Sequence, residues 1–334
     1  MRITLADIAR KAGVSKMTVS RVISGKGQIA SDTRIRVMRI IDEMGYHPNL
    51  IARSLASRHS MILGVIIPWK ERLLLDNYFA QVLSGIMDSA RNHHYRILLC
   101  PVEIGRDDGK KYLNIARTRL LDGMILVQTK SDDPNIDVLA DSGFPFILVN
   151  QRPLSKHCSY VDSENVKGAQ TAVRYLYGLG HREIACVAGS MDESNGRDRL
   201  QGYRQTMKEL GLSPDEEWII HGDFEQETAY SKSVRLFRGR RRPTAVFCSD
   251  DFMAIGVMRR ILESGLRVPG DVAVVGFDDI EAASYVQPSL TTIRQPMAGL
   301  GKASVDILLD LIDGRRKAPV HRLLPTELVK RDSA

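Results

Sequence analysis

Apolar positions in the first 45 residues follow helical spacing and predict three short helices. The first helix begins with a capping box formed by Thr4 and Asp7. It ends at Gly13, which allows the positive φ of a tight turn, and Ser15 is a suitable N-cap for the second helix. The third helix begins near residue 31 and ends at Gly45. The apolar faces expected to pack together are Leu5, Ile8, Ala9 and Ala12 in the first helix, Val19, Val22 and Ile23 in the second, and Ile35, Met38, Ile41 and Met44 in the third.

Two helices joined by a three-residue turn and supported by a third helix are typical of a helix-turn-helix domain. In that geometry the second helix lies in the major groove of DNA, with its N-terminal residues at the base edges. Its outward-facing residues are Lys16, Met17, Ser20 and Arg21.

From residue 61 onward, apolar runs of strand length alternate with amphipathic runs of helix length. This alternation predicts parallel sheets with crossover helices, and the chain is long enough for two such lobes. The expected strands include 62–67, 96–101, 123–127, 146–149, 183–188, 218–221, 245–248 and 272–277, and the expected helices include 78–92, 166–179, 200–210, 225–237 and 252–264.

Composition restricts the class of protein further. Hydrophobic residues make up 43% of the chain, yet no apolar run is long enough to span a bilayer, and the first residues do not have the pattern of a signal peptide. We therefore expect a cytoplasmic protein with no membrane partner, and with reduced, mostly buried cysteines at positions Cys100, Cys158, Cys186 and Cys248.

The charge is distributed unevenly along the chain. Residues 1–60 hold 11 basic and 4 acidic residues, a net charge of +7, while the other 274 residues hold 36 of each. A basic head on a neutral body is typical of a protein that binds a polyanion such as DNA.

Several segments in the first 55 residues resemble the DNA-binding head of the lactose-repressor family of bacterial transcription regulators (LacI/GalR type). These segments are 5–9, 12–15, 18–21, 45–49 and 52–55. The resemblance implies that Lys16, Met17 and Arg21 read bases, and that Ser15, Thr18, Tyr46 and Asn49 contact phosphates. The full predicted DNA-binding set is Thr4, Leu5, Ser15, Lys16, Met17, Thr18, Ser20, Arg21, Tyr46, Asn49, Arg53 and Leu55.

Residues 49–58 form the predicted hinge. Pro48 prevents a helix from continuing upstream and Asn49 can cap a new one, but a helix this short is marginal in water on its own. The resemblance implies that paired hinge helices form on DNA and insert a leucine, here Leu55, into the minor groove. The alternative is that Leu55 packs against the head.

The resemblance continues through the body, in the segments 179–182, 199–203, 247–256, 265–272, 275–279, 290–293 and 324–329. It implies a body similar to periplasmic sugar-binding proteins, with two lobes, three crossings between them and a ligand in the cleft. The expected fold is therefore an all-α helix-turn-helix head plus hinge helix, joined to an α/β two-lobed periplasmic-binding-protein-like domain with parallel sheets. The expected boundaries are 1–48 for the head, 49–59 for the hinge and linker, and 60–334 for the effector and dimerisation domain, whose first lobe covers about 60–161 and 294–322 and whose second lobe covers about 162–293 and 323–334.

A site for a sugar or sugar acid needs carboxylates, an arginine, amides and an aromatic face, placed at the carboxyl ends of parallel strands. Arg199 and Asp278 match the family best, and Asp251 and Asp279 are expected to cap helices instead. Three arginines near the expected cleft favour a sugar acid. The candidate effector-binding residues are Arg199, Asp278, Asp250, Phe224, Tyr78, Phe79, Gln128, Asn150, Arg152, Asp162, Arg197 and Gln295.

These features predict a transcription regulator, most simply a repressor, that binds a near-palindromic operator as a homodimer and responds to a small molecule. We expect no leucine-heptad tail of the kind that would form a tetramer, and no cofactor, metal site or catalytic residue. Three alternatives remain: a purine co-repressor, indicated by the segment 222–225; a transporter's solute-binding protein; and an enzyme using Asp250, Asp251, Asp278 and Asp279.

Overall fold

The computed structural model describes residues 3–24, 27–46, 59–68, 77–103, 109–153, 158–239 and 241–334. The chain divides into two compact units, Met1–Ile62 with Arg119–Asp122 and Leu63–Thr118 with Gly123–Ala334. No helix in the described part of the chain is long and apolar enough to cross a membrane.

The first unit contains a three-helix head whose local signals agree with the sequence prediction. The Thr4 amide donates to the Asp7 carboxylate at 3.0 Å, and Gly13 and Gly45 end their helices with φ of 66° and 60°. The Ser15 hydroxyl accepts from the Thr18 amide at 3.0 Å, as expected of an N-cap. The helices of the head are α1 (Leu5–Ala12), α2 (Lys16–Ser24) and α3 (Ser31–Met44).

The predicted inner face of α3 is wrong in part. Ile35 is 67% exposed and Met38 is 44% exposed, whereas Val37, Ile40 and Ile41 are buried. Residues 37, 40, 41 and 44 make one stripe at i, i+3, i+4 and i+7, and Ile35 lies about 200° around the helix from Val37.

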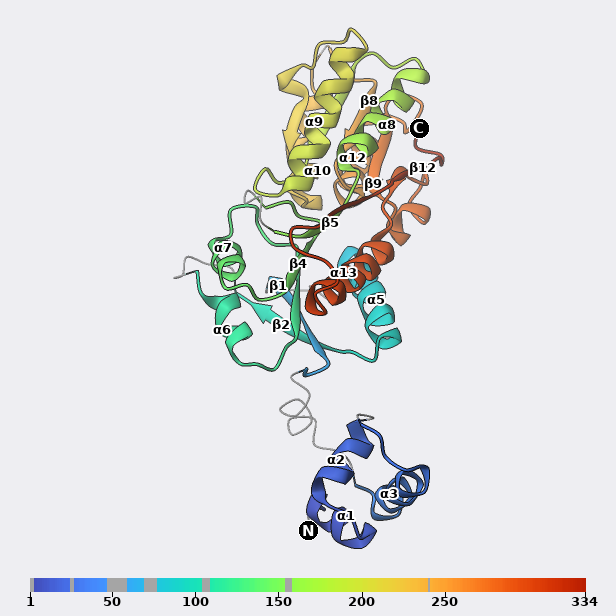
Figure 1. The fold of residues 1–334 in the computed structure, drawn as a ribbon. Helices are drawn as coiled ribbons and strands as arrows, with labels where there is room; N and C mark the ends of the chain where they lie inside the picture. The colour runs from blue at the N-terminus through green and yellow to red at the C-terminus, as the bar shows by residue number, and fades with distance from the viewer. Residues whose placement is uncertain are drawn as a thin grey trace. The chain divides into compact units, whose positions relative to one another are not determined.

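The second unit consists of two lobes, each a six-stranded sheet flanked by helices (Figure 1). In the first lobe β3 pairs in parallel with β1 and β4, and β5 pairs in parallel with β4 and β11. The strand order is β11-β5-β4-β3-β1-β2. The strands are β1 (Ile62–Pro68), β2 (Arg96–Val102), β3 (Gly123–Val127), β4 (Phe146–Val149), β5 (Tyr160–Ser163) and β11 (His321–Leu324), and the helices are α5 (Asn77–Asn92), α6 (Lys111–Arg117), α7 (Pro134–Asp141) and α13 (Met297–Ile312).

The second lobe has the strand order β12-β10-β9-β8-β6-β7. Its pairs are parallel except for β10 with β12, which is antiparallel. The strands are β6 (Ile184–Ala188), β7 (Ile219–His221), β8 (Ala245–Cys248), β9 (Ala273–Asp278), β10 (Thr291–Arg294) and β12 (Glu327–Val329). The helices are α8 (Asn165–Gly178), α9 (Ser194–Glu209), α10 (Gln226–Lys232), α11 (Val234–Phe237) and α12 (Asp251–Glu263), with 3-10 turns η2 (Glu216–Trp218) and η3 (Glu281–Ser284).

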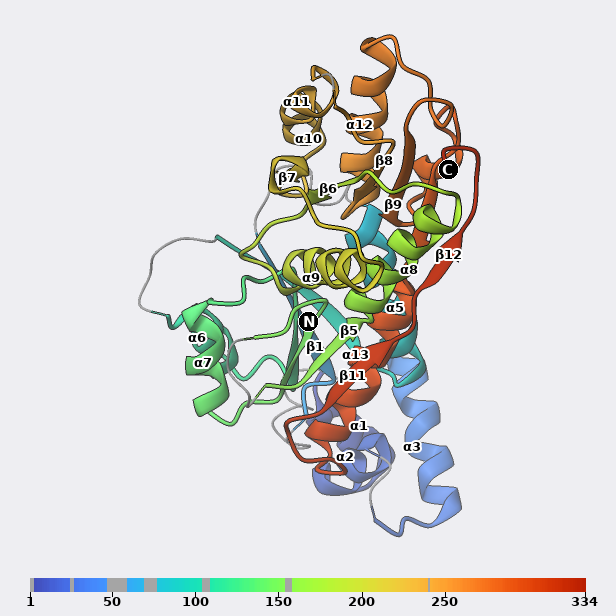
Figure 2. The ribbon, with the colours of Figure 1, turned by 90° about the horizontal axis from the view of Figure 1, so that it is seen from above.

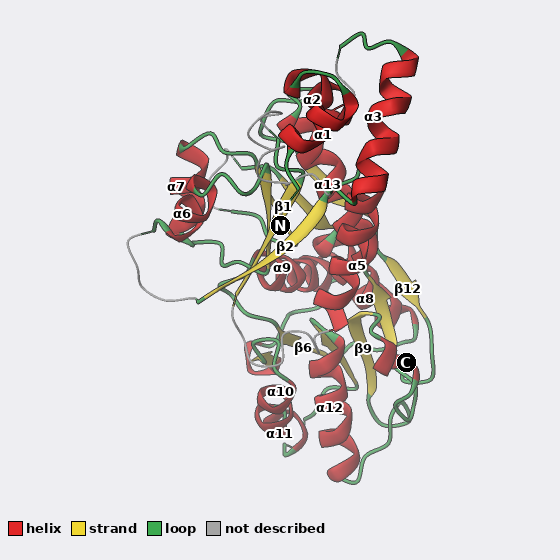
Figure 3. Cartoon of the chain, turned by 90° about the horizontal axis from the view of Figure 1, so that it is seen from below, coloured by secondary structure: helices red, strands yellow, loops and turns green. Residues whose placement is uncertain are grey.

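The polypeptide passes from one sheet to the other three times: between β5 and α8, between β10 and α13, and between β11 and β12. Figure 2 shows the last crossing as the extended C-terminal segment that runs from β11 to β12. Figure 3 shows the alternation of strands and helices that the hydrophobic pattern predicted.

Two predicted helices differ from those observed. Helix α9 begins at Ser194 and not at residue 200. The prediction missed its first turn because that turn is polar and has no apolar periodicity, although most of its residues are buried. The predicted helix 225–237 is two helices, α10 and α11, which meet at Ser233.

Helices α5 and α13 pack closely in the first lobe because glycines lie at their crossing. A Cβ atom on Gly85 would lie 2.0 Å from the Ala298 carbonyl oxygen, and one on Gly301 would lie 2.1 Å from the Val82 carbonyl oxygen. All four cysteines are free thiols; Cys158, Cys186 and Cys248 are buried and Cys100 is partly buried.

Candidate nucleic-acid interface and effector cleft

Helix α2 presents a polar and basic surface at its N-terminal end. Lys16, Met17 and Arg21 are exposed, and Met17 has 63% of its surface accessible although it is apolar. Val19 and Val22 face the head core, so the outward side of α2 is fixed by the packing of its inner side. A helix N-terminus with exposed N–H groups and basic neighbours suits phosphate and base contacts.

The remaining predicted DNA-binding residues have mixed environments. The hydroxyl of Thr4 donates to Asp7 at 2.6 Å, Ser15 and Thr18 share a hydroxyl contact of 2.9 Å, and Leu5 and Tyr46 pack partly against the head core. Ser20 is partly buried. Asn49, Arg53, Leu55 and the predicted hinge lie outside the described residues.

A polar cleft of about 130 Å³ lies between the two lobes. First-lobe residues reach it from α5 and from the ends of β3 and β4, and second-lobe residues reach it from α9, α12 and the ends of β7, β8 and β9. The lining comprises Tyr78, Gln128, Asn150, Glu193, Asn195, Arg199, Phe224, Asp250, Phe252, Asp278 and Gln295.

Four lining residues have a positive φ although none is glycine. Gln128 and Asn150 directly follow β3 and β4 with φ of 55° and 57°, Phe224 follows β7 with 61°, and Asp278 ends β9 with 121°. Positive φ is costly for such residues and persists only where the surrounding structure enforces it. The strand ends therefore turn these side chains into one cleft at an energetic cost, which is typical of a binding site.

Arg199 is the centre of the hydrogen-bond network of the cleft. Its side chain is 2% exposed and stacks on Phe277, with the guanidinium carbon 3.8 Å from the ring centroid. Nε donates to Asn165 Oδ1 at 2.9 Å, and Nη1 donates to the Ser249 carbonyl oxygen at 2.5 Å and to Asp278 Oδ1 at 3.3 Å. The guanidinium is thus held in one orientation at the wall of the cleft.

Buried polar atoms of the lining that make no hydrogen bond within the described structure include Asn150 Oδ1, Arg199 Nη2 and Gln295 Oε1. The orientation of the Gln295 amide is fixed because its Nε2 donates to Asp278 Oδ1 at 2.5 Å. A buried polar atom without a partner costs about 1–3 kcal/mol. Two acceptors and one donor in a single cleft are therefore available to a ligand.

The paired aspartates after β8 have different roles from those expected. Asp250, not Asp251, caps α12, accepting from the Met253 amide at 2.7 Å. Asp251 is fully buried and accepts from the Thr292 hydroxyl and the Ile280 amide. Burial, with the nearby Asp278 carboxylate, holds the pKa of Asp251 well above its usual range.

Asp279, which was also expected to cap a helix, caps none. Its carboxylate accepts hydrogen bonds from Arg294 at 2.7 Å and from Arg331 at 2.6 Å.

Comparison with known proteins identifies both parts of the chain. Residues 4–49 match the family described as bacterial regulatory proteins, lacI family, and residues 173–334 match the periplasmic binding protein-like domain. The HTH-type transcriptional repressor PurR of Vibrio vulnificus (strain CMCP6) is 33% identical over 332 residues, which cover 99% of this chain and 98% of the relative. The chain belongs to the LacI family.

Other similar proteins agree with this membership. The PurR repressor of Proteus mirabilis (strain HI4320) is 34% identical, over 99% of this chain and 96% of its own. A solved lac repressor dimer bound to operator and the anti-inducer ONPF has a TM-score of 0.87 at 31% identity, with 100% of this chain and 99% of that chain covered. A complex of the transcriptional regulator CelR with cellobiose has a TM-score of 0.77 at 32% identity, with both chains fully covered.

As a LacI-family protein, the chain is a DNA-binding transcriptional repressor with an effector-binding domain, and this family is not enzymatic. The two alternatives of another class, a transporter's solute-binding protein and an enzyme, are therefore wrong. The predicted two-lobed fold with parallel sheets is confirmed.

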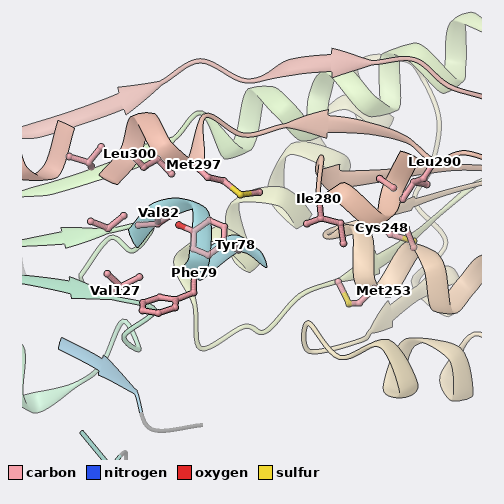
Figure 4. Close-up of a cluster of buried hydrophobic side chains, with 14 of the residues drawn as sticks. Tyr78, Phe79, Val82, Val127, Cys248, Met253, Ile280, Leu290, Met297 and Leu300 are labelled. Carbon is pink, nitrogen blue, oxygen red and sulfur yellow. The ribbon is translucent and has the colours of Figure 1, made fainter. Parts of the chain in front are cut away.

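Not all predicted effector residues of this LacI-family chain meet in the cleft. Eight of the twelve line it, and Phe79, Arg152, Asp162 and Arg197 are absent from its described lining. Phe79 is buried in the hydrophobic core; Figure 4 shows it with Val82 and Val127 of the first lobe. Arg197 donates to the Ser131 hydroxyl and to the Met191 carbonyl oxygen, both at 2.6 Å. Arg152 and Asp162 belong to a separate cluster near the cleft.

The sequence prediction missed three lining residues: Glu193, Asn195 and Phe252. Glu193 and Asn195 lie at the N-terminal end of α9, one turn before Arg199. Placing the start of α9 correctly would have shown them, because residues three or four apart share a helix face. Phe252 follows the two aspartates that begin α12.

Proposed function

We propose that this repressor binds a near-palindromic operator as a homodimer, and that a sugar bound between its lobes controls its operator affinity. The single observation that carries the effector assignment is the set of buried, unpaired atoms Asn150 Oδ1, Gln295 Oε1 and Arg199 Nη2. A hydroxyl group can donate to the two oxygens and accept from the guanidinium, so a polyhydroxylated ligand satisfies all three atoms.

The charges around the cleft favour a neutral sugar over a sugar acid. Among the described lining residues, the carboxylates Glu193, Asp250 and Asp278 outnumber the one guanidinium, Arg199, which is already paired with Asp278 at 3.3 Å. The sequence prediction of an acidic ligand also relied on Arg152 and Arg197. Arg152 lies beside Asp162 and Asp198, and Arg197 donates to Ser131 and Met191, so neither side chain lines the cleft. An anion would therefore enter a field of its own sign.

A purine is the second candidate. Relatives that are 33–34% identical over nearly the whole chain are PurR repressors, and Phe224 provides an aromatic face 5.9 Å from the Arg199 guanidinium carbon. A purine base offers ring N–H donors to Asp278, but fewer groups that both donate and accept than a sugar does.

The domain assignment also remains our proposal: a head at 1–48, a hinge and linker at 49–59 and an effector domain at 60–334, acting in the cytoplasm where its operator lies. The lac repressor is seen as a dimer on operator. Two-fold symmetry of the protein would place two α2 helices on matching half-sites.

Calorimetry on the full chain tests the effector assignment. The titrants are neutral mono- and disaccharides, the matching aldonic and uronic acids, and guanine and hypoxanthine. We expect a neutral sugar to bind, and Arg199→Met or Asp278→Asn to weaken it by about tenfold or more, because each leaves buried polar groups unpaired.

Arg117→Met and Asp141→Asn are matched controls on exposed positions of α6 and α7 and should bind as the unchanged protein does. Tight binding of a purine or a sugar acid, with no neutral sugar bound, would contradict the proposal. So would a sugar whose affinity is the same in all four variants.

A further inference from the structure

A second polar cluster joins the lobes where the first turns of α9 meet the loop after β4. It consists of Arg152 after β4, Asp162 on β5 and Asp198 on α9, and we call it the Arg152 cluster. Arg152 Nη2 forms an ion pair with Asp198 Oδ2 of the second lobe, and Arg152 Nε lies 3.9 Å from Asp162 Oδ2 of the first. One guanidinium is therefore shared by two carboxylates that face each other across the lobe boundary.

Asp162 is fully buried, and its two oxygens differ. Oδ1 accepts from the Ser163 amide at 2.7 Å and from Asn165 Nδ2 at 2.8 Å. Oδ2 accepts no hydrogen bond within the described structure, although it is buried. A protonated carboxyl would carry its hydrogen on such an oxygen at no loss of an existing bond.

The charged groups packed around Asp162 do not neutralise both the Asp162 and the Asp198 carboxylates. The loop after β4 contributes Arg152, and α9 contributes Asp198 and Arg199. Arg199 already pairs with Asp278, α8 contributes the neutral Asn165, and β11 pairs its Leu323 with Asp162. On α9, Arg197 also acts on Asp198, although its hydrogen bonds go elsewhere. Glu164, next to Asp162, pairs with Lys167 at 2.6 Å.

The pKa of Asp162 is raised to about 7, chiefly by burial and also by the Asp198 carboxylate, against the lowering effect of the hydrogen bond from the Ser163 amide and of the Arg152 and Arg199 guanidiniums. Burial likewise raises the pKa of Asp198. The cluster therefore changes its proton occupancy near neutral pH.

We propose that the Arg152 cluster is a proton-operated latch between the two lobes. With one proton bound to Asp162, Arg152 pairs fully with Asp198 and ties the first lobe to α9. When that proton leaves, Asp162 competes for Arg152 and repels Asp198 across the boundary, and the latch loosens.

Three backbone amides cross the same boundary and report directly on the latch. The Ser194 amide donates to Gln151 Oε1 at 2.8 Å, and the Arg152 amide donates to the Ser194 hydroxyl at 2.8 Å. The Ser131 amide donates to the Asp192 carbonyl oxygen at 3.1 Å. Each of these amides must break its hydrogen bond across the lobe boundary before it can exchange with solvent.

The latch is connected to the cleft through Asn165. Its Nδ2 donates to Asp162 and its Oδ1 accepts from Arg199 Nε at 2.9 Å, so one side chain touches both the latch and the cleft arginine. If the proposed effector binds between closed lobes, its affinity should fall as the pH rises through 7. This consequence rests on the proposed function, whereas the latch itself does not.

Hydrogen exchange of the full-length protein at pH 6 and pH 8 tests the latch without any effector. The exchange rates of the Ser131, Arg152 and Ser194 amides in the unchanged protein are divided by the rates of the same amides in Asp162→Asn at the same pH. This division cancels the intrinsic pH dependence of exchange. We expect this ratio to rise about tenfold from pH 6 to pH 8, the change that proton linkage gives for one group of pKa near 7. The matched control Asp141→Asn, on an exposed position of α7, should behave as the unchanged protein does.

A ratio that stays constant between the two pH values would overturn the proposal. Asp198→Asn gives an independent test should Asp162→Asn fail to fold, because it removes the repulsion across the boundary. Because Asp141→Asn keeps the latch, the ratio of the exchange rates of Asp198→Asn to those of Asp141→Asn should fall about fivefold or more from pH 6 to pH 8. A ratio that stays constant over this interval would also overturn the latch. A latch that responds to pH while no sugar binds would disprove the proposed effector alone.

Discussion

At the scale of single residues, the function of the protein depends on which side chains face DNA and which charged side chains are buried. Lys16 is the first residue of α2 and is exposed, at the end of the helix that enters the major groove in helix-turn-helix proteins. We expect Lys16→Ala to weaken binding to the best operator by about 1–3 kcal/mol and to relax the preference at one base position. Selection of binding sites from random DNA measures both effects. Lys208→Ala on α9 is the control, and an unchanged motif for Lys16→Ala would show that α2 is not the reading helix.

Asp162 gives the second prediction at this scale. Its pKa in the folded protein is raised to about 7, above the 3.8 of an unperturbed aspartate, so ionisation is disfavoured by folding. The unfolded chain then releases this proton first, and stability falls as pH rises from about 4 to 7. We expect the melting temperature of Asp162→Asn to decline less over this range than that of the unchanged protein. Parallel curves for the two proteins would contradict the assigned pKa.

Cleft residues were predictable from the sequence where a strand ends. Gln128, Asn150 and Asp278 end or follow apolar strands, and parallel strands bring their carboxyl ends to one edge. Arg152 and Arg197 were misleading because sequence position does not say which carboxylate or hydroxyl will capture a long basic side chain. Phe79 was ambiguous because adjacent helix residues face different directions, and it is Tyr78 that reaches the cleft.

At the scale of elements, the contact between α5 and α13 shapes the first lobe. A Cβ on Gly85 would meet the Ala298 carbonyl oxygen at 2.0 Å, so the helices must separate to accommodate it. We expect Gly85→Ala to lower the free energy of unfolding by about 1–3 kcal/mol, measured by urea denaturation. Gly178→Ala is the matched control, because nothing lies within 4 Å of the position of its Cβ near the end of α8, and alanine favours a helix. Equal stability of the two variants would contradict the packing described.

Hydrophobic periodicity predicted most elements, and it failed where burial is polar. The first turn of α9 buries Ser194, Asn195, Asp198 and Arg199, a pattern without apolar spacing. The face of α3 was misassigned because apolar residues occupy two sides of that helix and only tertiary packing chooses between them.

At the scale of the whole molecule, the formal charge predicts how DNA binding responds to salt. The net charge of +7 comes entirely from residues 1–60. If a dimer neutralises about 6–10 phosphates, the logarithm of the association constant should fall with the logarithm of salt concentration at a slope of about −5 to −9. Fluorescence anisotropy with a labelled duplex measures the slope. A slope near zero would mean that the basic head is not the DNA-binding surface.

The central claim is that one small molecule in the cleft and one DNA site on the head are coupled. The most direct test measures operator affinity with and without the sugar identified by calorimetry, and sugar affinity with and without operator. Coupling is reciprocal, so both affinities should change by the same factor, about 5–150-fold, and Asp278→Asn should lose the response while keeping sugar-free operator binding. A sugar that occupies the cleft and leaves operator affinity unchanged would contradict the account.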